Sequence, residues 1–109
     1  MATNFKGVGN SIQLIAPSGG VTGGNVYKQG KFIGVVEASA AEGEAFTLNL
    51  TNVYEVPKEA PLAITAGDEL YWVAANSNFN KTASGNTYGG KAFADAASAD
   101  TTVLIRLDN

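Results

Sequence analysis

The feature that most restricts the fold of this chain is a set of short segments in which apolar and polar residues alternate. Residues 12–16, 46–50 and 103–107 place apolar side chains at every second position. A period of two puts those side chains on one face of an extended strand. Leu104 interrupts the alternation in the last segment, which predicts a strand that is covered on both faces. We therefore expect a chain built from β-strands.

Turn signals separate these segments. Residues 27–32 are typical of a tight hairpin, in which Gly30 supplies the positive φ angle that such turns need. Residues 69–73 form a further apolar segment that predicts a strand. The alanine-rich segment 92–99 is the best helix candidate, but its apolar face is almost all alanine and is too small to anchor a helix. We expect a strand followed by a turn there.

Length and composition set the size of the fold. The chain has 109 residues, which corresponds to one domain, and 45% of them are hydrophobic, which argues against global disorder. Only 16% are charged, which fits a surface that is partly covered in use. We expect an all-β fold, a small single-domain β-barrel or β-sandwich that is jelly-roll-like. Residues 1–10 are predicted to form an N-terminal arm, and residues 11–109 a single β domain.

The two halves of the chain also resemble each other. The sequence Val21-Thr-Gly-Gly-Asn-Val-Tyr27 is similar to Ile64-Thr-Ala-Gly-Asp-Glu-Leu-Tyr71, and residues 34–50 are similar to residues 90–107. The second half carries an insertion at about residues 76–86. Two such halves can share one core and close their edges against each other. Duplication is one hypothesis, and chance similarity between glycine- and alanine-rich segments is the other.

Charge and residue types argue against several classes of function. Seven basic and ten acidic residues give a net charge of −3, and the basic residues are scattered along the chain. We expect no nucleic-acid and no membrane partner, because both need clustered positive charge or a long apolar run. The sequence contains no Cys and no His. It can therefore build no metal site from thiolate or imidazole ligands.

The carboxylates do not form a recognisable catalytic pair. Glu42 and Glu44 flank a glycine in an expected turn, and the neighbours Asp68 and Glu69 point to opposite sides of a strand. An acid–base couple needs carboxyl groups with different environments in one pocket. Asp68 is expected to shape the turn that precedes it. We therefore expect a protein that is not an enzyme and that uses no cofactor or metal.

Candidate interface residues follow from loop placement and aromatic character. Phe5 lies in a polar arm that offers little local core to bury it. Tyr71 and Trp72 are neighbours on a strand, so one faces the core and the other faces outward or into a second layer. Burial of both by the insertion is the alternative. The candidate residues are Phe5, Lys6, Val21, Thr22, Tyr71, Trp72, Asn78 and Phe79.

Six segments, in order along the chain, resemble one family of phage proteins. They are Gly19-Gly-Val-Thr-Gly-Gly24, Phe32-Ile-Gly-Val-Val36, Ala40-Ala-Glu-Gly-Glu44, Val53-Tyr-Glu-Val-Pro-Lys58, Ala66-Gly-Asp-Glu-Leu-Tyr-Trp72 and Val103-Leu-Ile-Arg-Leu107. Together they are similar to the capsid cement, or decoration, proteins of bacteriophages, from about residue 5 to residue 107. The pair Gly90-Lys91 and the polar stretch 76–86 depart from the family's pattern.

The resemblance implies a structural virion protein with no enzymatic activity and no cofactor. Such proteins look like compact β domains that bind the outside of the phage head and bridge neighbouring major capsid proteins. The resemblance implies the major capsid protein as partner, and a homotrimer or a dimer at capsid symmetry axes. The expected capsid or self contacts are residues 3–9, 19–24 and 76–86.

Two further expectations accompany this hypothesis. The polar N-terminus lacks the apolar core of a signal peptide, so we expect synthesis in the host cytoplasm and assembly into the virion. The alternative function is another virion interaction module, either a tail or fibre-base domain or a glycan-binding β domain. In a glycan-binding domain, exposed Tyr and Trp side chains would line the sugar site.

Overall fold

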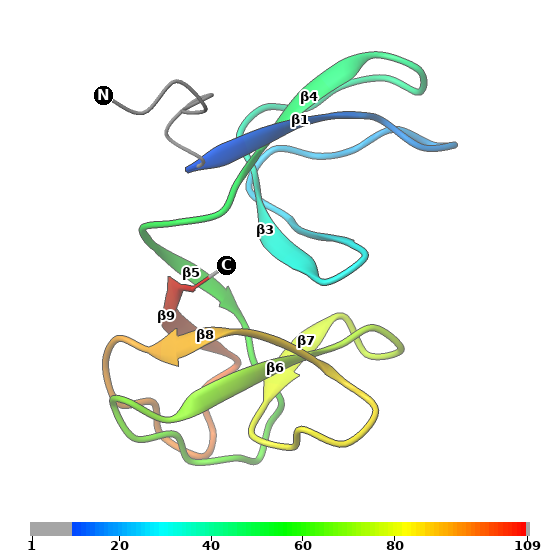
Figure 1. The fold of residues 1–109 in the computed structure, drawn as a ribbon. Helices are drawn as coiled ribbons and strands as arrows, with labels where there is room; N and C mark the ends of the chain where they lie inside the picture. The colour runs from blue at the N-terminus through cyan, green and yellow to red at the C-terminus, as the bar shows by residue number, and fades with distance from the viewer. Residues whose placement is uncertain (1–9, 109) are drawn as a thin grey trace, which may run out of the picture.

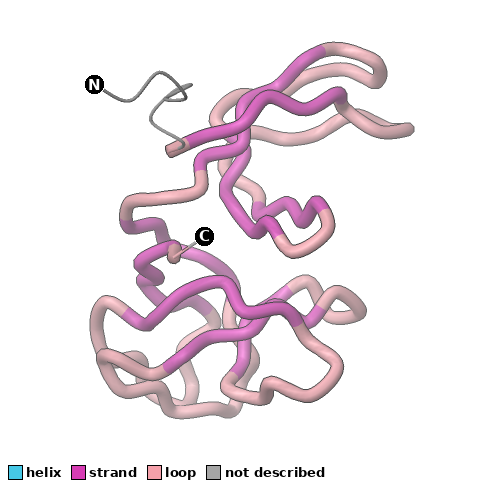
Figure 2. Tube along the Cα trace, viewed as in Figure 1, coloured by secondary structure: helices cyan, strands magenta, loops and turns pink. Residues whose placement is uncertain are grey.

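The computed structural model describes residues 10–108, which form nine β-strands and no helix (Figures 1 and 2). All strand pairs are antiparallel and make two sheets. This arrangement confirms the predicted all-β fold. The strands are β1 (Ser11–Ile15), β2 (Val26–Gln29), β3 (Phe32–Val36), β4 (Ala45–Asn49), β5 (Val53–Pro57), β6 (Glu69–Val73), β7 (Asn78–Asn80), β8 (Thr87–Ala92) and β9 (Thr102–Leu107).

The first sheet has the strand order β1-β4-β3-β2. β1 pairs with β4 over its whole length, and Gln13 lies opposite Thr47. β2 and β3 form the predicted hairpin around Gly30, whose φ is 60°. Gly34 on β3 is needed for a close approach, because a Cβ atom there would collide with the carbonyl oxygen of Asn49 on β4. The alternating segments and the turn at Gly30 therefore predicted most of the first sheet.

The second sheet has the order β5-β9-β8-β6-β7 and curls into a half-barrel, drawn in the lower part of Figure 1. Its two ends meet, because Lys58 after β5 forms a bridge with Phe79 on β7. The backbone N–H of Glu59 also donates to the carbonyl of Phe79 at 2.9 Å. A register shift between Leu70 and Tyr71 marks a β-bulge, which increases the local twist.

Two hydrophobic clusters form the core. The larger cluster fills the half-barrel, and the smaller one packs against the first sheet. β3 contributes to both, since Ile33 and Val35 belong to the larger cluster and Val36 belongs to the smaller one. This shared strand makes the two sheets one packed unit. The fully buried side chains with the largest volumes are Phe79, Ile33, Leu48, Leu50, Leu70, Ile105, Val36 and Val56.

The two sheets repeat one strand order. β1, β2, β3 and β4 occupy the places in the first sheet that β5, β6, β8 and β9 occupy in the second, and β7 is added at the edge. An isolated bridge between Val21 and Ala40 in the first half matches a bridge between Ile64 and Ala96 in the second. The repeated order agrees with the similarity of the two halves in sequence. A duplicated origin stays a prediction.

The alanine-rich segment is a turn that follows a strand. β8 ends at Ala92, and the segment then turns back towards β9. The Ala97 N–H donates to the Asp100 carboxylate at 2.9 Å, which holds the turn closed. The expectation for residues 92–99 is thus confirmed. The predicted N-terminal arm lies outside the described residues except for Asn10.

Lys58 is a buried charged residue at the closure of the half-barrel. Its side chain is 3% exposed, and its ammonium group donates to the backbone carbonyls of Glu59, Ser98 and Asp100 at 2.9, 3.4 and 2.6 Å. A buried ammonium group is tolerated only where acceptors replace its water shell. The Lys58 backbone N–H also donates to the Thr101 carbonyl at 2.9 Å. Lys58 therefore fastens the turn before β9 to the end of β5.

Candidate functional site

The predicted loop residues Val21 and Thr22 lie at one end of the first sheet. Val21 and Ala40 exchange two backbone hydrogen bonds, of 2.9 and 3.1 Å. The Gly23 N–H donates to the Ser39 hydroxyl at 2.9 Å. The side chain of Thr22 is exposed, and that of Val21 is half-buried. This loop is held by hydrogen bonds and presents Thr22 to solvent.

The predicted aromatic pair on β6 divides between the core and the outer surface. Trp72 is buried, and its ring centroid lies 5.0 Å from that of Phe79. Tyr71 is half-buried on the other face and packs edge-on against Tyr88, with ring centroids 5.7 Å apart. Of the pair, only Tyr71 is therefore available to a partner molecule.

The remaining predicted residues lie on β7 or in the arm. Phe79 is fully buried in the half-barrel, so its side chain does not reach the surface. Asn78 is half-buried, and its side-chain oxygen is buried without a hydrogen-bond partner. Phe5 and Lys6 lie outside the described residues. The predicted set therefore does not form one continuous surface among the described residues.

A hollow of about 310 Å³ lies between the β2–β3 hairpin and β8. The Tyr88 hydroxyl donates to the Asp108 carboxylate at 3.0 Å, and the Tyr71 hydroxyl donates to the Glu69 carboxylate at 3.1 Å. Phe32 at the hairpin is 45% exposed. Two aromatic side chains, Phe32 and Tyr88, thus occur at this hollow together with the hydrogen-bonded Asp108 carboxylate. The hollow is lined by Lys31, Phe32, Thr87, Tyr88 and Asp108.

The environment of Tyr88 predicts a pH dependence of stability. Burial, with the hydrogen bond to Asp108 as the second cause, raises the pKa of Tyr88 from its usual value near 10 to about 12. Between these values the folded chain keeps a proton that the unfolded chain has lost, so stability falls as pH rises from about 10 to about 12. We expect Tyr88→Phe to remove one late step from the absorbance titration of tyrosinate. An unchanged titration would contradict this assignment.

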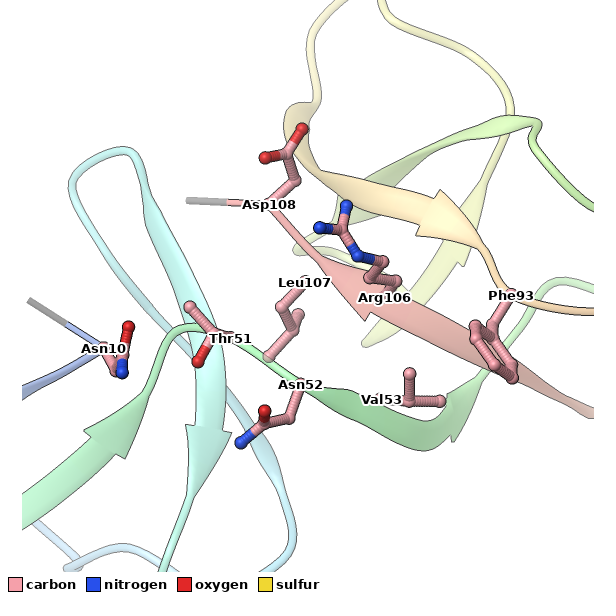
Figure 3. A pocket seen from close by; sticks show the side chains of 8 residues that line it. All are labelled: Asn10, Thr51, Asn52, Val53, Phe93, Arg106, Leu107 and Asp108. Carbon is pink, nitrogen blue, oxygen red and sulfur yellow. The ribbon is translucent and has the colours of Figure 1, made fainter.

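A second depression, of about 560 Å³, lies where the two sheets meet (Figure 3). Asn10 and Thr51 line it on the side of the first sheet, and Val53, Phe93 and Arg106 line it on the side of the second. Phe93 is 57% exposed, although it is a large apolar side chain. The depression is therefore lined by both polar and apolar side chains, of which Phe93 offers apolar area that a partner would cover.

The register of the strands extends this surface across the second sheet. The register of β5, β9, β8 and β6 places a set of side chains on one side, which we call the outer face of β9: Val53, Glu55, Pro57, Glu69, Lys91, Phe93, Thr102, Leu104 and Arg106. Leu104 is 39% exposed. Its apolar side chain was the break in alternation that predicted a strand covered on both faces. Nothing within residues 10–108 covers this second face.

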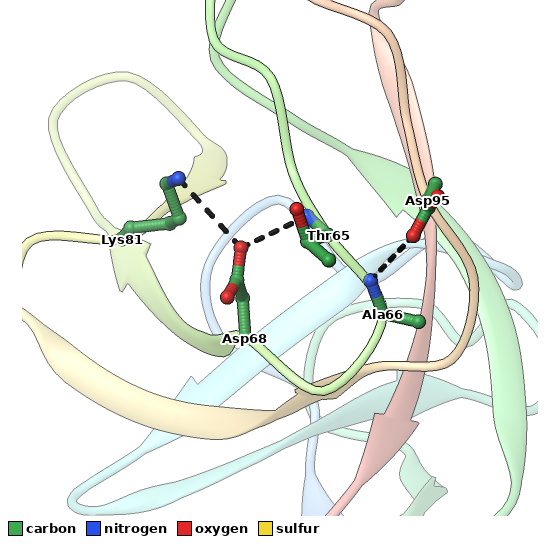
Figure 4. A network of polar contacts seen from close by, with 5 residues as sticks. All are labelled: Thr65, Ala66, Asp68, Lys81 and Asp95. Atoms are coloured by element: carbon green, nitrogen blue, oxygen red, sulfur yellow. Dashed lines mark hydrogen bonds and ion pairs between the residues drawn. The ribbon is translucent and has the colours of Figure 1, made fainter.

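The carboxylates near the turns have structural partners (Figure 4). Asp68 accepts a hydrogen bond from the Thr65 N–H at 2.9 Å and lies 3.6 Å from the ammonium group of Lys81. Asp95 accepts from the Ala66 N–H at 2.7 Å. Asp68 therefore shapes its turn, as predicted. Residues 10–108 contain no group of three or more His, Cys, Asp and Glu side chains placed to hold a metal ion, nor a helix that could cross a bilayer.

Several surface residues were not singled out from the sequence. Tyr88 and Phe32 come together only through the packing of the two halves, so no local pattern indicates their contact with one hollow. Phe93 lies in the alanine-rich segment, where a single large apolar residue at a turn was an available signal. Leu104 did give a local signal, the break in alternation. Its position on the same face as Phe93 follows only from the pairing of β8 with β9.

Comparison with known proteins identifies the family. No curated protein and no solved structure matches the chain significantly. A family model described as phage cement protein matches residues 7–107, which is nearly the whole chain. The match includes every strand of both sheets. The chain belongs to the phage cement protein family.

Proposed function

We propose that this protein binds the outer surface of an assembled phage head and stabilises contacts between neighbouring major capsid proteins. The observation that carries the proposal is the family match over residues 7–107, which indicates a structural role in the phage capsid. The chain measures 44 × 41 × 23 Å along its principal axes. A flat domain can touch more than one neighbour on a shell while adding little height.

The outer face of β9 is the surface that we assign to the capsid. Phe93 and Leu104 supply exposed apolar area, which stabilises a complex when it is covered. Lys91 and Arg106 lie opposite each other on neighbouring strands, and neither side chain has a hydrogen bond or an ion pair within residues 10–108. Like charges in this position repel. Glu69 lies opposite Lys91 on β6 and supplies one carboxylate on this face, and we propose that a capsid carboxylate adds a partner for Arg106.

Some of the interface residues predicted from the sequence are part of this proposal. Thr22 and Tyr71 are accessible and are proposed as additional contacts, and Phe5 and Lys6 are proposed as contacts of the N-terminal segment. Repeated contacts on a symmetric lattice add avidity, so no single contact has to be tight. We also propose that the protein is made in the host cytoplasm and joins the head there.

The direct test is co-sedimentation of the purified protein with expanded heads that lack it and, separately, with unexpanded procapsids. We expect saturable binding to expanded heads at a fixed ratio to the major capsid protein. Phe93→Asp should weaken this binding at least about tenfold, because covering an interface anchor contributes about 2 kcal/mol. Ala99→Asp introduces the same charge at an exposed turn position outside the outer face of β9, so this control should bind as wild type does. Absence of binding to either particle would overturn the proposal.

A second candidate function is glycan binding at the hollow beside Tyr88. The observation that favours it is the meeting of Phe32 and Tyr88 with the Asp108 carboxylate, since sugars stack on aromatic rings and donate hydrogen bonds to carboxylates. Saturable binding of a glycan by the isolated protein, lost in Phe32→Ala, would support this function. Binding to heads that Phe32→Ala leaves unchanged would favour the capsid role instead.

A further inference from the structure

The edge of the first sheet formed by β1 has none of the features that usually prevent strand pairing between chains. Proteins protect exposed edges with charged residues, proline or very short strands. Of the other edge strands in residues 10–108, β2 carries Lys28, β5 carries Glu55 and Pro57, and β7 has three residues. β1 has five residues, Ser-Ile-Gln-Leu-Ile, with no charge and no proline. Figure 1 shows it beside β4 at the edge of the sheet.

The backbone groups on this edge can be assigned from the register. The Leu50 N–H donates to the Asn10 carbonyl, and the Ala16 N–H donates to the Glu44 carbonyl. Because hydrogen-bonded pairs alternate along an antiparallel ladder, the even-numbered residues of β1 bond to β4. The N–H and C=O groups of Ser11, Gln13 and Ile15 therefore point to the open edge, where β1 has no neighbouring strand within residues 10–108.

The side chains of β1 also leave apolar surface uncovered. Ile12 and Leu14 pack against the smaller hydrophobic cluster but are only half-buried. Ile15, on the opposite face, is 64% exposed, which is the largest exposure among the large apolar side chains of the described residues. A strand added at this edge would cover Ile12 and Leu14 and extend the cluster.

We propose that β1 of one chain pairs antiparallel with β1 of a second copy, so that the two four-stranded sheets become one continuous sheet. The sequence of β1 suits pairing about a two-fold axis at Gln13. Gln13 then lies opposite Gln13 of the partner subunit. Ile12 lies opposite the partner's Leu14, and Ser11 lies opposite the partner's Ile15. No like charges meet, and every open N–H and C=O group of β1 gains a partner.

The test is the mass of the full-length protein in solution, measured by sedimentation equilibrium over a range of concentrations. We expect twice the monomer mass for the wild type and the monomer mass for Gln13→Pro, which removes an N–H that points to the open edge. Proline is tolerated at edge positions with solvent-facing N–H groups, so the monomer should fold. Lys28→Pro is the matched control, because the β2–β3 register also turns the Lys28 N–H outward. It should leave the mass doubled.

Charge substitutions test the register itself. Gln13→Lys and Gln13→Glu should each be monomeric, since like charges would then lie opposite each other. An equimolar mixture of the two should recover the doubled mass. A monomeric wild type, a mass of three chains, or a dimer that survives Gln13→Pro would each overturn the inference. None of these outcomes tests binding to heads, so the proposed function stands or falls separately.

Discussion

Replacing Phe79 by alanine is expected to lower the free energy of unfolding by about 3–5 kcal/mol, the range for deleting a large buried aromatic side chain. Phe79 is fully buried, and its ring packs edge-on against Trp72 with ring centroids 5.0 Å apart. Gly89 lies so close that a Cβ atom there would collide with the Phe79 ring. The ring therefore fills the space between β7 and β8, and few atoms around it can move inward to fill a cavity.

The measurement is denaturant unfolding followed by tryptophan fluorescence. The chain has one tryptophan, so Trp72 reports directly on this part of the core. Phe32→Ala is the matched control, because Phe32 is 45% exposed and should change the unfolding free energy by only about 0.5 kcal/mol. Equal losses in the two variants would mean that the half-barrel does not close around Phe79 as described.

Phe79 also illustrates that local strand patterns can be predicted from the sequence, whereas burial that depends on long-range contacts cannot. The alternating segments predicted β1, β4 and β9, because a period of two is a local property that the sequence displays directly. Phe79 was proposed as an interface residue, since it lies between two asparagines in a polar stretch. Its burial depends on the bridge between β7 and Lys58, which joins the ends of a curled sheet. Such closure is a long-range property that no single segment encodes.

The surface residues also differ in whether a local sequence pattern predicts their role. Leu104 broke the alternation of its strand, and that local signal predicted a strand covered on both faces, but the Leu104 side chain is 39% exposed. Tyr88 gave no comparable signal, because its partners are distant in sequence: Tyr71 lies on β6, before β7, and Asp108 follows β9. Surface sites assembled from several strands require the fold before their members can be grouped.

Replacing Lys58 by methionine is expected to lower the free energy of unfolding by about 2–3 kcal/mol, because hydrogen bonds from a charged donor are stronger than neutral ones. Methionine keeps most of the length of the apolar stem, so the change isolates the ammonium group. The carbonyls of Glu59, Ser98 and Asp100 would lose their shared donor. A gain from no longer burying a charge opposes this loss. The loss should exceed the gain, since three polar groups lose a bond at once.

Denaturant unfolding of Lys58→Met and Lys28→Met separates this effect from a general loss of positive charge. Lys28 is exposed on β2, so its replacement should change the unfolding free energy by only about 0.5 kcal/mol. Hydrogen exchange adds a local readout, because the Glu59 N–H bonds to Phe79 across the closure of the half-barrel and the Lys58 N–H bonds to Thr101 in the turn before β9. Faster exchange of these two amides in Lys58→Met, with β1 and β4 unaffected, would show that the ammonium group holds the closure rather than the whole fold. An unfolding free energy equal to that of the wild type would contradict the prediction, because it would mean that the gain from no longer burying a charge equals the loss of the three hydrogen bonds.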